Sequence, residues 1–387
     1  MAFVEYTNLR TPNDVLSAMV TFLKLKGFTV VKDIADDMNI YDRSSTDGKK
    51  VAFKDKTGAY TIILRSANGT NIFGNNNDSY MDTLSPSTSA NYYGVGMVVA
   101  EGYSNTQRWY NQFNAPLALN TGIGYRQGDV QGVWLPVPSK IKTENKTENM
   151  EYTLYCNHVP IPTSTVTFSL VRSNSKYKQV AHMSFANLAK YEDWEGGIIY
   201  SASANMYMID TAYQVFSDNK NFDTYILPLY GCSERSNTFL RIDIDEATTE
   251  ERGFIYWACS GTDIITGKPL ATPIRTSLST NGKIPHYYYL ESKSQLDSGM
   301  DVNTLNCITV NLPMFVAVRV DPDVLDNYAA VGSISGLYFI STLNVQTGGV
   351  YEMSYPESGY RCQVFPFGRR RGHFGFDGIS IKQMDDV

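Results

Sequence analysis

The chain has 387 residues, of which 27 are tyrosine, 18 phenylalanine and 4 tryptophan, while only 19% are charged. A hydrophobic content of 43% excludes a wholly disordered chain, and no apolar run approaches the ~18 residues of a membrane-spanning helix. The formal net charge is −6 at pH 7, without the basic excess typical of nucleic-acid binders. We therefore expect no membrane insertion and no nucleic acid as a main partner.

The first third of the chain combines one helix with β structure. Thr11 and Pro12 are typical of a helix start, and apolar residues recur at helical spacing before Gly27, namely Val15, Met19, Phe22 and Leu23. Residues 50–65 alternate in polarity around a turn at residues 56–58. The sequence thus predicts an amphipathic helix of about four turns followed by a β-hairpin.

A charged stretch divides the chain into two parts. This stretch, residues 139–149, is poor in large apolar groups. Before it, residues 68–79 are predicted to form a polar loop, and the residues that follow the loop are rich in glycine and aromatic side chains. We predict an α+β N-terminal domain over residues 1–138, a linker or long loop over 139–149, and a β-rich C-terminal region of one or two sub-domains over 150–387.

The C-terminal part is a series of short candidate strands bounded by turn residues. Alternation is clearest at Val166, Phe168 and Leu170. The fold class that follows is mainly β with a short N-terminal helix, arranged as β-sandwich or barrel-like domains. The candidate strands are residues 152–156, 164–172, 179–185, 198–201, 239–244, 253–259, 307–320, 336–343, 349–355, 360–366 and 378–382.

No recognised catalytic signature occurs in the chain. Nucleophile elbows, phosphate-binding loops, zinc-protease motifs and dinucleotide fingerprints are absent from the sequence. The 4 histidines are far apart, and the 5 cysteines include no closely spaced pair, so we expect buried thiols rather than a zinc site. We therefore predict no enzyme activity, no catalytic residue, no metal and no cofactor.

Two groups of carboxylates beside aromatic residues leave glycan cleavage as an alternative. Asp193 and Glu195 flank Trp194, and a second group precedes Tyr256 and Trp257, formed by Asp243, Asp245 and Glu246. Paired carboxylates and stacking rings are the requirements of glycoside hydrolysis. The same residues also suit a solvated loop and the wet face of an edge strand, which we favour.

A basic triplet near the C-terminus is a candidate interface. Arg369, Arg370 and Arg371 follow Phe365 and Phe367. Guanidinium groups bind carboxylates and phosphates well, so the triplet could contact another subunit or a nucleic acid, or form a solvated hairpin loop.

A cluster of aromatic residues is a candidate glycan-binding surface. Tyr287, Tyr288 and Tyr289 are consecutive, and Trp194 supplies a further ring. Such rings stack on sugars, but they also suit subunit interfaces and cores, where tyrosine gives a large contact area at small entropic cost.

Several segments resemble structural proteins of tailed bacteriophages. The longest covers residues 180–203, in which Ala186 and the pair Glu192-Asp193 stand where the related proteins commonly have glycine. Further segments resemble the same proteins in the same order along the chain, at residues 51–65, 104–116, 331–339, 362–371 and 375–379.

The resemblance implies assembly rather than chemistry, because its motifs transfer no catalytic residue. It implies a β-rich structural subunit of the virion, in the tail or baseplate, assembled in the host cytoplasm. Its expected partners are other copies of itself and other tail or baseplate proteins. A host-glycan receptor-binding module of the tail and a neck or collar component are the alternatives.

Overall fold

Strands dominate the structure, which is a computed structural model. It describes residues 3–31, 50–70, 92–104, 112, 133–137, 140–142, 147–173, 180–193, 195–204, 237–243, 254–257, 271–273, 311–319, 328–341, 346–353, 359–366 and 377–384. Within these residues the strands form antiparallel sheets, none of which closes into a barrel. Their one helix is α1 (Pro12–Leu25). The predicted class, mainly β with a short N-terminal helix, is confirmed.

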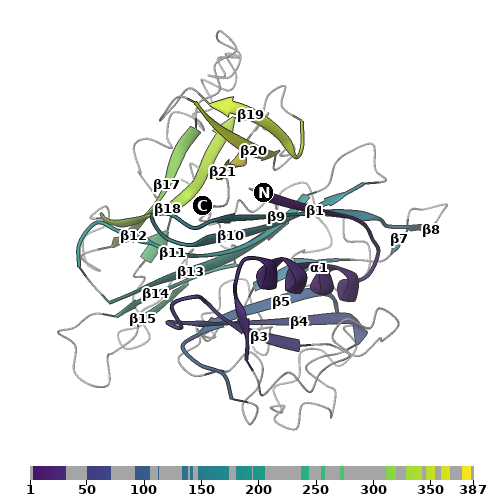
Figure 1. The fold of residues 1–387 in the computed structure, drawn as a ribbon, viewed down its shortest axis with the longest axis horizontal. Helices are drawn as coiled ribbons and strands as arrows, with labels where there is room; N and C mark the ends of the chain where they lie inside the picture. The colour runs from purple at the N-terminus through teal and green to yellow at the C-terminus, as the bar shows by residue number, and fades with distance from the viewer. Residues whose placement is uncertain are drawn as a thin grey trace.

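A seven-stranded sheet, here called the central sheet, forms the middle layer of the molecule (Figure 1). Its strands pair in the order β1-β9-β10-β11-β13-β14-β15. Their bounds are β1 (Phe3–Leu9), β9 (Tyr152–Val159), β10 (Thr165–Arg172), β11 (Val180–Asn187), β13 (Glu195–Ala204), β14 (Asn237–Asp243) and β15 (Phe254–Trp257).

A five-stranded sheet, the N-terminal sheet, lies on one side of the central sheet. Its order is β2-β3-β4-β5-β6, with bounds β2 (Thr29–Val30), β3 (Lys50–Lys54), β4 (Thr61–Thr70), β5 (Tyr92–Ala100) and β6 (Val133–Pro136). The pairing of β3 with β4 confirms the predicted hairpin. Its turn is organised by the Asp55 carboxylate, which accepts hydrogen bonds from the backbone N–H groups of Thr57 and Tyr60.

The C-terminal sheet lies on the other side of the central sheet (Figure 1). Its order is β16-β17-β18-β21-β20-β19, and the short strand β12 (Ala189–Lys190) also pairs with β18. The bounds are β16 (Ala271–Pro273), β17 (Asn311–Arg319), β18 (Tyr328–Ser341), β19 (Gly349–Met353), β20 (Tyr360–Pro366) and β21 (Asp377–Gln383). A separate two-stranded sheet pairs β7 (Lys140–Lys142) with β8 (Thr147–Asn149).

Helix α1 is buried between the central and N-terminal sheets (Figure 1). The Phe22 ring packs edge-on against Phe168 of β10, while the Ser66 hydroxyl of β4 donates a hydrogen bond to Asn13. Only a narrow stripe reaches solvent, at Thr21, Lys24 and Leu25 with half-buried Ser17. The helix is therefore apolar on two sides, as expected for one enclosed by two sheets, rather than on the single face of an amphipathic surface helix.

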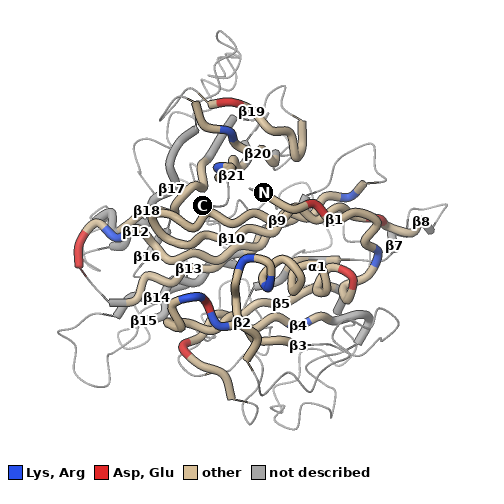
Figure 2. Tube along the Cα trace, viewed as in Figure 1, with Lys and Arg blue, Asp and Glu red and all other residues tan. Residues whose placement is uncertain are grey.

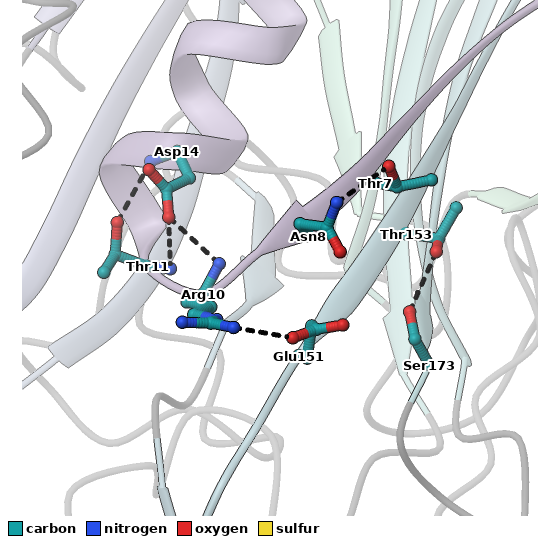
Figure 3. A network of polar contacts seen from close by, with 8 residues as sticks. All are labelled: Thr7, Asn8, Arg10, Thr11, Asp14, Glu151, Thr153 and Ser173. Atoms are coloured by element: carbon teal, nitrogen blue, oxygen red, sulfur yellow. Dashed lines mark hydrogen bonds and ion pairs between the residues drawn. The ribbon is translucent and has the colours of Figure 1, made fainter.

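The start of α1 is fixed by the predicted cap (Figure 3). The Thr11 hydroxyl accepts a hydrogen bond from the Asp14 N–H at 3.1 Å, and the Asp14 carboxylate accepts from the N–H of Thr11 and of Arg10, both at 3.0 Å. The Arg10 guanidinium also pairs with Glu151 at 3.0 Å, just before β9 begins. The turn between β1 and α1 is thus held at the edge of the central sheet.

Residues on the two sides of the stretch 139–149 share one sheet and one core. β1 pairs with β9 from Phe3 opposite Asn157 to Leu9 opposite Tyr152. A single cluster of buried apolar side chains joins α1 and the N-terminal sheet to strands β9, β10, β11 and β13. The domain division predicted at 139–149 stays a prediction, and any two domains there would be joined by this common core.

With 14 residues, α1 is too short to cross a membrane, and the described part of the chain contains no longer helix.

Candidate functional site

Of the residues predicted to form an interface, Phe365 is the one that the structure describes. It lies on β20 and its side chain is fully buried. Its ring centroid is 5.3 Å from that of Tyr155 and 5.6 Å from that of His182, both on the central sheet. Phe365 therefore faces the interior rather than the surface. The remaining candidates lie outside the described residues: Arg369, Arg370, Arg371, Phe367, Trp194, Tyr287, Tyr288 and Tyr289.

One residue from each of the two sets of acidic residues considered for glycan cleavage lies in a paired strand of the central sheet. β13 pairs with β14 so that Glu195 lies opposite Asp243. β14 in turn pairs with β15, where Tyr256 and Trp257 lie. Asp193 is exposed in the segment before β13, and Asp245 and Glu246 lie outside the described residues. The register places two backbone positions side by side at the end of these strands and carries no assignment of chemistry.

The two faces of the central sheet differ sharply in chemistry. The face toward α1 is apolar, and its buried side chains are Leu154, Cys156, Val166, Phe168, Leu170, Ala181, Met183, Phe185, Tyr200 and Ala202. The opposite face carries Tyr155 and Asn157 on β9, and the register continues it across β10 and β11 through Thr165, Thr167, Ser169, His182 and Ser184. Strand alternation alone produces this separation.

The polar face is covered by the C-terminal sheet, and we call the buried contact between them the polar layer. Asn157, Thr165, Thr167, Ser169, His182 and Ser184 are each at most 1% exposed. Alternation of this kind is typical of a sheet with one face in water, yet here both faces are buried. β9 and β11 contain no Lys, Arg, Asp or Glu, and β9 is drawn without blue or red in Figure 2, so these strands contribute polar but uncharged groups to the layer.

Three amides connect the two sides of the polar layer. Asn157 Nδ2 donates a hydrogen bond to Gln363 Oε1 at 3.1 Å, and Gln383 Nε2 donates to Asn157 Oδ1 at 2.9 Å. Gln363 Nε2 continues the chain of contacts to the Gly348 carbonyl at 3.2 Å. Asn157 is thus bonded to both β20 and β21, which fixes how these strands sit over β9.

His182 is the titratable group at the centre of the polar layer. Its Nδ1 shares a hydrogen bond with Ser169 Oγ at 2.9 Å, and its ring packs against Phe365. Burial lowers the pKa of His182 to about 3, so the imidazole is neutral in the docked layer at ordinary pH. Near it, the hydroxyls of Thr165 and Thr167 are buried with no hydrogen-bond partner among the described residues.

Backbone geometry brings the C-terminal sheet close to β9 at two glycines. A Cβ at Gly336 would lie 2.7 Å from Val159 Cγ1, and a Cβ at Gly348 would lie 2.9 Å from the Tyr155 ring. Both glycines also have positive φ, of 67° and 74°. These positions therefore require glycine for space as well as for conformation.

The described residues contain no cluster of three or more His, Cys, Asp or Glu side chains that could hold a metal ion. Cys156 and Cys362 are buried free thiols, as expected from the sequence, and the other cysteines lie outside the described residues.

The polar layer was not predicted from the sequence. The available signal was the alternating threonine and serine of β10 with His182 and Ser184 of β11, but alternation does not reveal what covers the polar face.

No protein-family model matches the chain, and no curated protein matches it in sequence.

Proposed function

We propose that the chain is a structural subunit of a tailed-phage virion, in the tail or baseplate, that acts by assembling with copies of itself and with other tail or baseplate proteins. The proposal rests on the ordered segments that resemble phage structural proteins. One spatial observation supports it: segments far apart in sequence are neighbours in the fold. Residues 180–203 meet residues 331–339 where Ala189 pairs with Ser333 and Lys190 with Gly332.

The contact at Gly332 shows how closely these two segments fit. A Cβ at this position would lie 2.9 Å from the Ala189 carbonyl oxygen and 3.3 Å from the Leu188 side chain. The segments at 362–371 and 375–379 are neighbours too, because β20 pairs with β21. The described parts of these four segments thus adjoin one another in the strand pairing.

Sheet edges support an assembly role. Within the described residues β1 pairs on one side only, with β9, and β19 pairs on one side only, with β20. An edge strand offers backbone N–H and C=O groups to which a strand of another subunit can add. The low proportion of charged residues, 19% of the chain, suits surfaces that are covered by neighbouring subunits.

The test is mass spectrometry of purified phage particles that encode this chain. We expect several copies of the chain in each mature particle. The ratio of the chain to known tail proteins should stay constant through gradient purification. Host cytosolic proteins of similar abundance in the lysate provide the control, since they should be lost. Absence of the chain from purified particles would overturn the proposal.

The arginine triplet gives a second test of assembly. Changing Arg369, Arg370 and Arg371 together to alanine should lower incorporation into particles several-fold while the melting temperature of the isolated chain stays within a few degrees. Changing Lys24 alone to alanine on the exposed stripe of α1 serves as the control for loss of surface charge. Equal incorporation of the triple variant and the wild type would remove the interface role of the triplet.

A further inference from the structure

The polar face of the central sheet is suited to water, although the C-terminal sheet covers it. Thr165, Thr167 and Ser169 alternate along β10 with the apolar residues of the opposite face. Two of these three hydroxyls have no hydrogen-bond partner among the described residues. Burial of such groups opposes docking, because in water each of them would be hydrogen bonded.

The opposite side of the same sheet is predominantly apolar. Its apolar side chains pack with α1 and the N-terminal sheet in one continuous cluster, so separation there would expose a large hydrophobic surface. The polar layer is the more polar of the two contacts of the central sheet, although the C-terminal sheet also brings the buried side chains of Phe365, Ile379 and Ile381 to the face that carries Gln363. Contacts within a chain that are polar rather than apolar are the ones at which parts of a protein commonly move relative to each other.

We propose that the C-terminal sheet is a reversibly docked module, and that acid releases it from the central sheet through protonation of His182. Release breaks the amide contacts of Asn157 with Gln363 and Gln383 and withdraws Phe365 from His182. The backbone pairing of β12 with β18 lies outside these side-chain contacts and keeps the module attached. The surface exposed on the central sheet is then the row of hydroxyl and amide groups on β9, β10 and β11.

The pH response follows from the position of His182. The imidazole is neutral while it is buried, whereas in water a histidine takes up a proton below about pH 6.5. Acid therefore favours the released state, in which the ring reaches water and can be charged. Between pH 7 and pH 5 this linkage raises the fraction released by about 25-fold, as long as the released state remains a small minority.

The neighbouring titratable groups do not replace His182 in this role. Tyr155 on β9 is neutral at pH 5 to 7, as an ordinary tyrosine is, and burial, with a further contribution from Glu5, raises the pKa of its hydroxyl still further. Glu5 lies opposite Tyr155 on β1 and is exposed. Arg361 on β20 and Glu352 opposite it on β19 are also exposed, and Arg361 lies beside Gln383 of β21 in the strand register.

Hydrogen exchange followed by mass spectrometry on the full chain tests the proposal. Peptides covering β20 and β21 report release, and peptides covering α1 report global unfolding. Wild type and His182→Gln are compared with each other at pH 7 and again at pH 5, so that the intrinsic pH dependence of exchange cancels. In the wild type we expect β20 and β21 to open more often than α1 at both pH values. Their opening should rise about 25-fold from pH 7 to pH 5, and less than threefold in His182→Gln.

Two results would overturn the proposal. If β20 and β21 of the wild type open no more often than α1, the C-terminal sheet leaves only on global unfolding and is not a separate module. If they open separately but with equal pH dependence in wild type and His182→Gln, His182 is not the trigger. Thr167→Val provides a second variant should His182→Gln fail to fold. It removes a buried hydroxyl that both release and global unfolding expose to water, so exchange should slow in β20, β21 and α1 at both pH values, with β20 and β21 still opening more often than α1.

Discussion

Asn157 and Gln363, 206 positions apart in the chain, are joined by a buried hydrogen bond of 3.1 Å between the central and C-terminal sheets. Gln383 adds a second bond to the same asparagine. One amide on β9 therefore holds two neighbouring strands of the C-terminal sheet, and its loss should be felt by both.

A double-mutant cycle measures this contact. Asn157→Ala leaves the amides of Gln363 and Gln383 short of a partner in a buried site, so we expect a loss of about 1 to 3 kcal/mol in the free energy of unfolding. Gln363→Ala in the Asn157→Ala background should cost less than it does in the wild type, with a coupling of at least about 0.5 kcal/mol in urea denaturation. Strictly additive effects would show that the two side chains do not stabilise each other.

The two leucines near the end of α1 provide a matched comparison. Leu23 is fully buried and Leu25 is 64% exposed on the same helix. Leu23→Ala removes a side chain enclosed between two sheets and should lower the free energy of unfolding by about 2 to 5 kcal/mol. Leu25→Ala should change it by less than about 0.5 kcal/mol. Equal losses would contradict burial of the helix between the sheets, and chemical denaturation of both variants decides the point.

Two glycines with positive φ separate backbone strain from close packing. Gly359 has φ of 85°, and a Cβ at this position would have no neighbour within 4 Å. Gly336 has φ of 67°, and a Cβ there would lie 2.7 Å from Val159 Cγ1. Gly359→Ala should cost about 1 to 2 kcal/mol through conformation alone. Gly336→Ala should cost about 1 to 3 kcal/mol more, because its methyl group would overlap Val159 at the docked sheet. Thermal unfolding of the two variants gives the comparison, and a smaller loss for Gly336→Ala would contradict the close approach.

Acid should weaken the fold through His182. The pKa of this group is about 3 in the folded chain and about 6.5 when unfolded, so the unfolded chain binds the extra proton between these values. The contribution of the neutral imidazole to the free energy of unfolding is fully present above pH 6.5, and it is lost as the pH falls toward 3. From pH 7 to pH 5 the wild type should lose about 2 kcal/mol more than His182→Gln in urea denaturation. Parallel losses in the two proteins would contradict burial of a neutral His182.

Local sequence signals predicted the elements that depend on local chemistry. Thr11 and Pro12 marked the start of α1, and the turn near Thr57 marked the hairpin of β3 and β4. They could not show that α1 is covered on two sides, because Leu16 and Val20 lie outside the predicted apolar stripe and are nevertheless fully buried in the tertiary fold. Segment β1 was not predicted either, since Phe3–Leu9 becomes a strand through pairing with the distant β9.

The polar layer was beyond sequence prediction for a similar reason. The alternation at Val166, Phe168 and Leu170 correctly indicated a strand with one apolar face. The other face is covered by the strands that carry Gln363 and Gln383. These residues lie 206 and 226 positions after Asn157, to which both are hydrogen bonded. A contact between faces that are so distant along the chain leaves no periodicity in the sequence.

The pairing of β1 with β9 also sets the order in which the chain can fold as it leaves the ribosome. Phe3 is synthesised before its partner Asn157, which appears only after the whole N-terminal sheet has been synthesised. Closing so long a loop is slow, and the apolar sides of α1 lack one of their two covering sheets until β9, β10 and β11 exist. Strand β1 therefore has to wait for a partner that is synthesised much later, and it joins the central sheet only after β9 has formed.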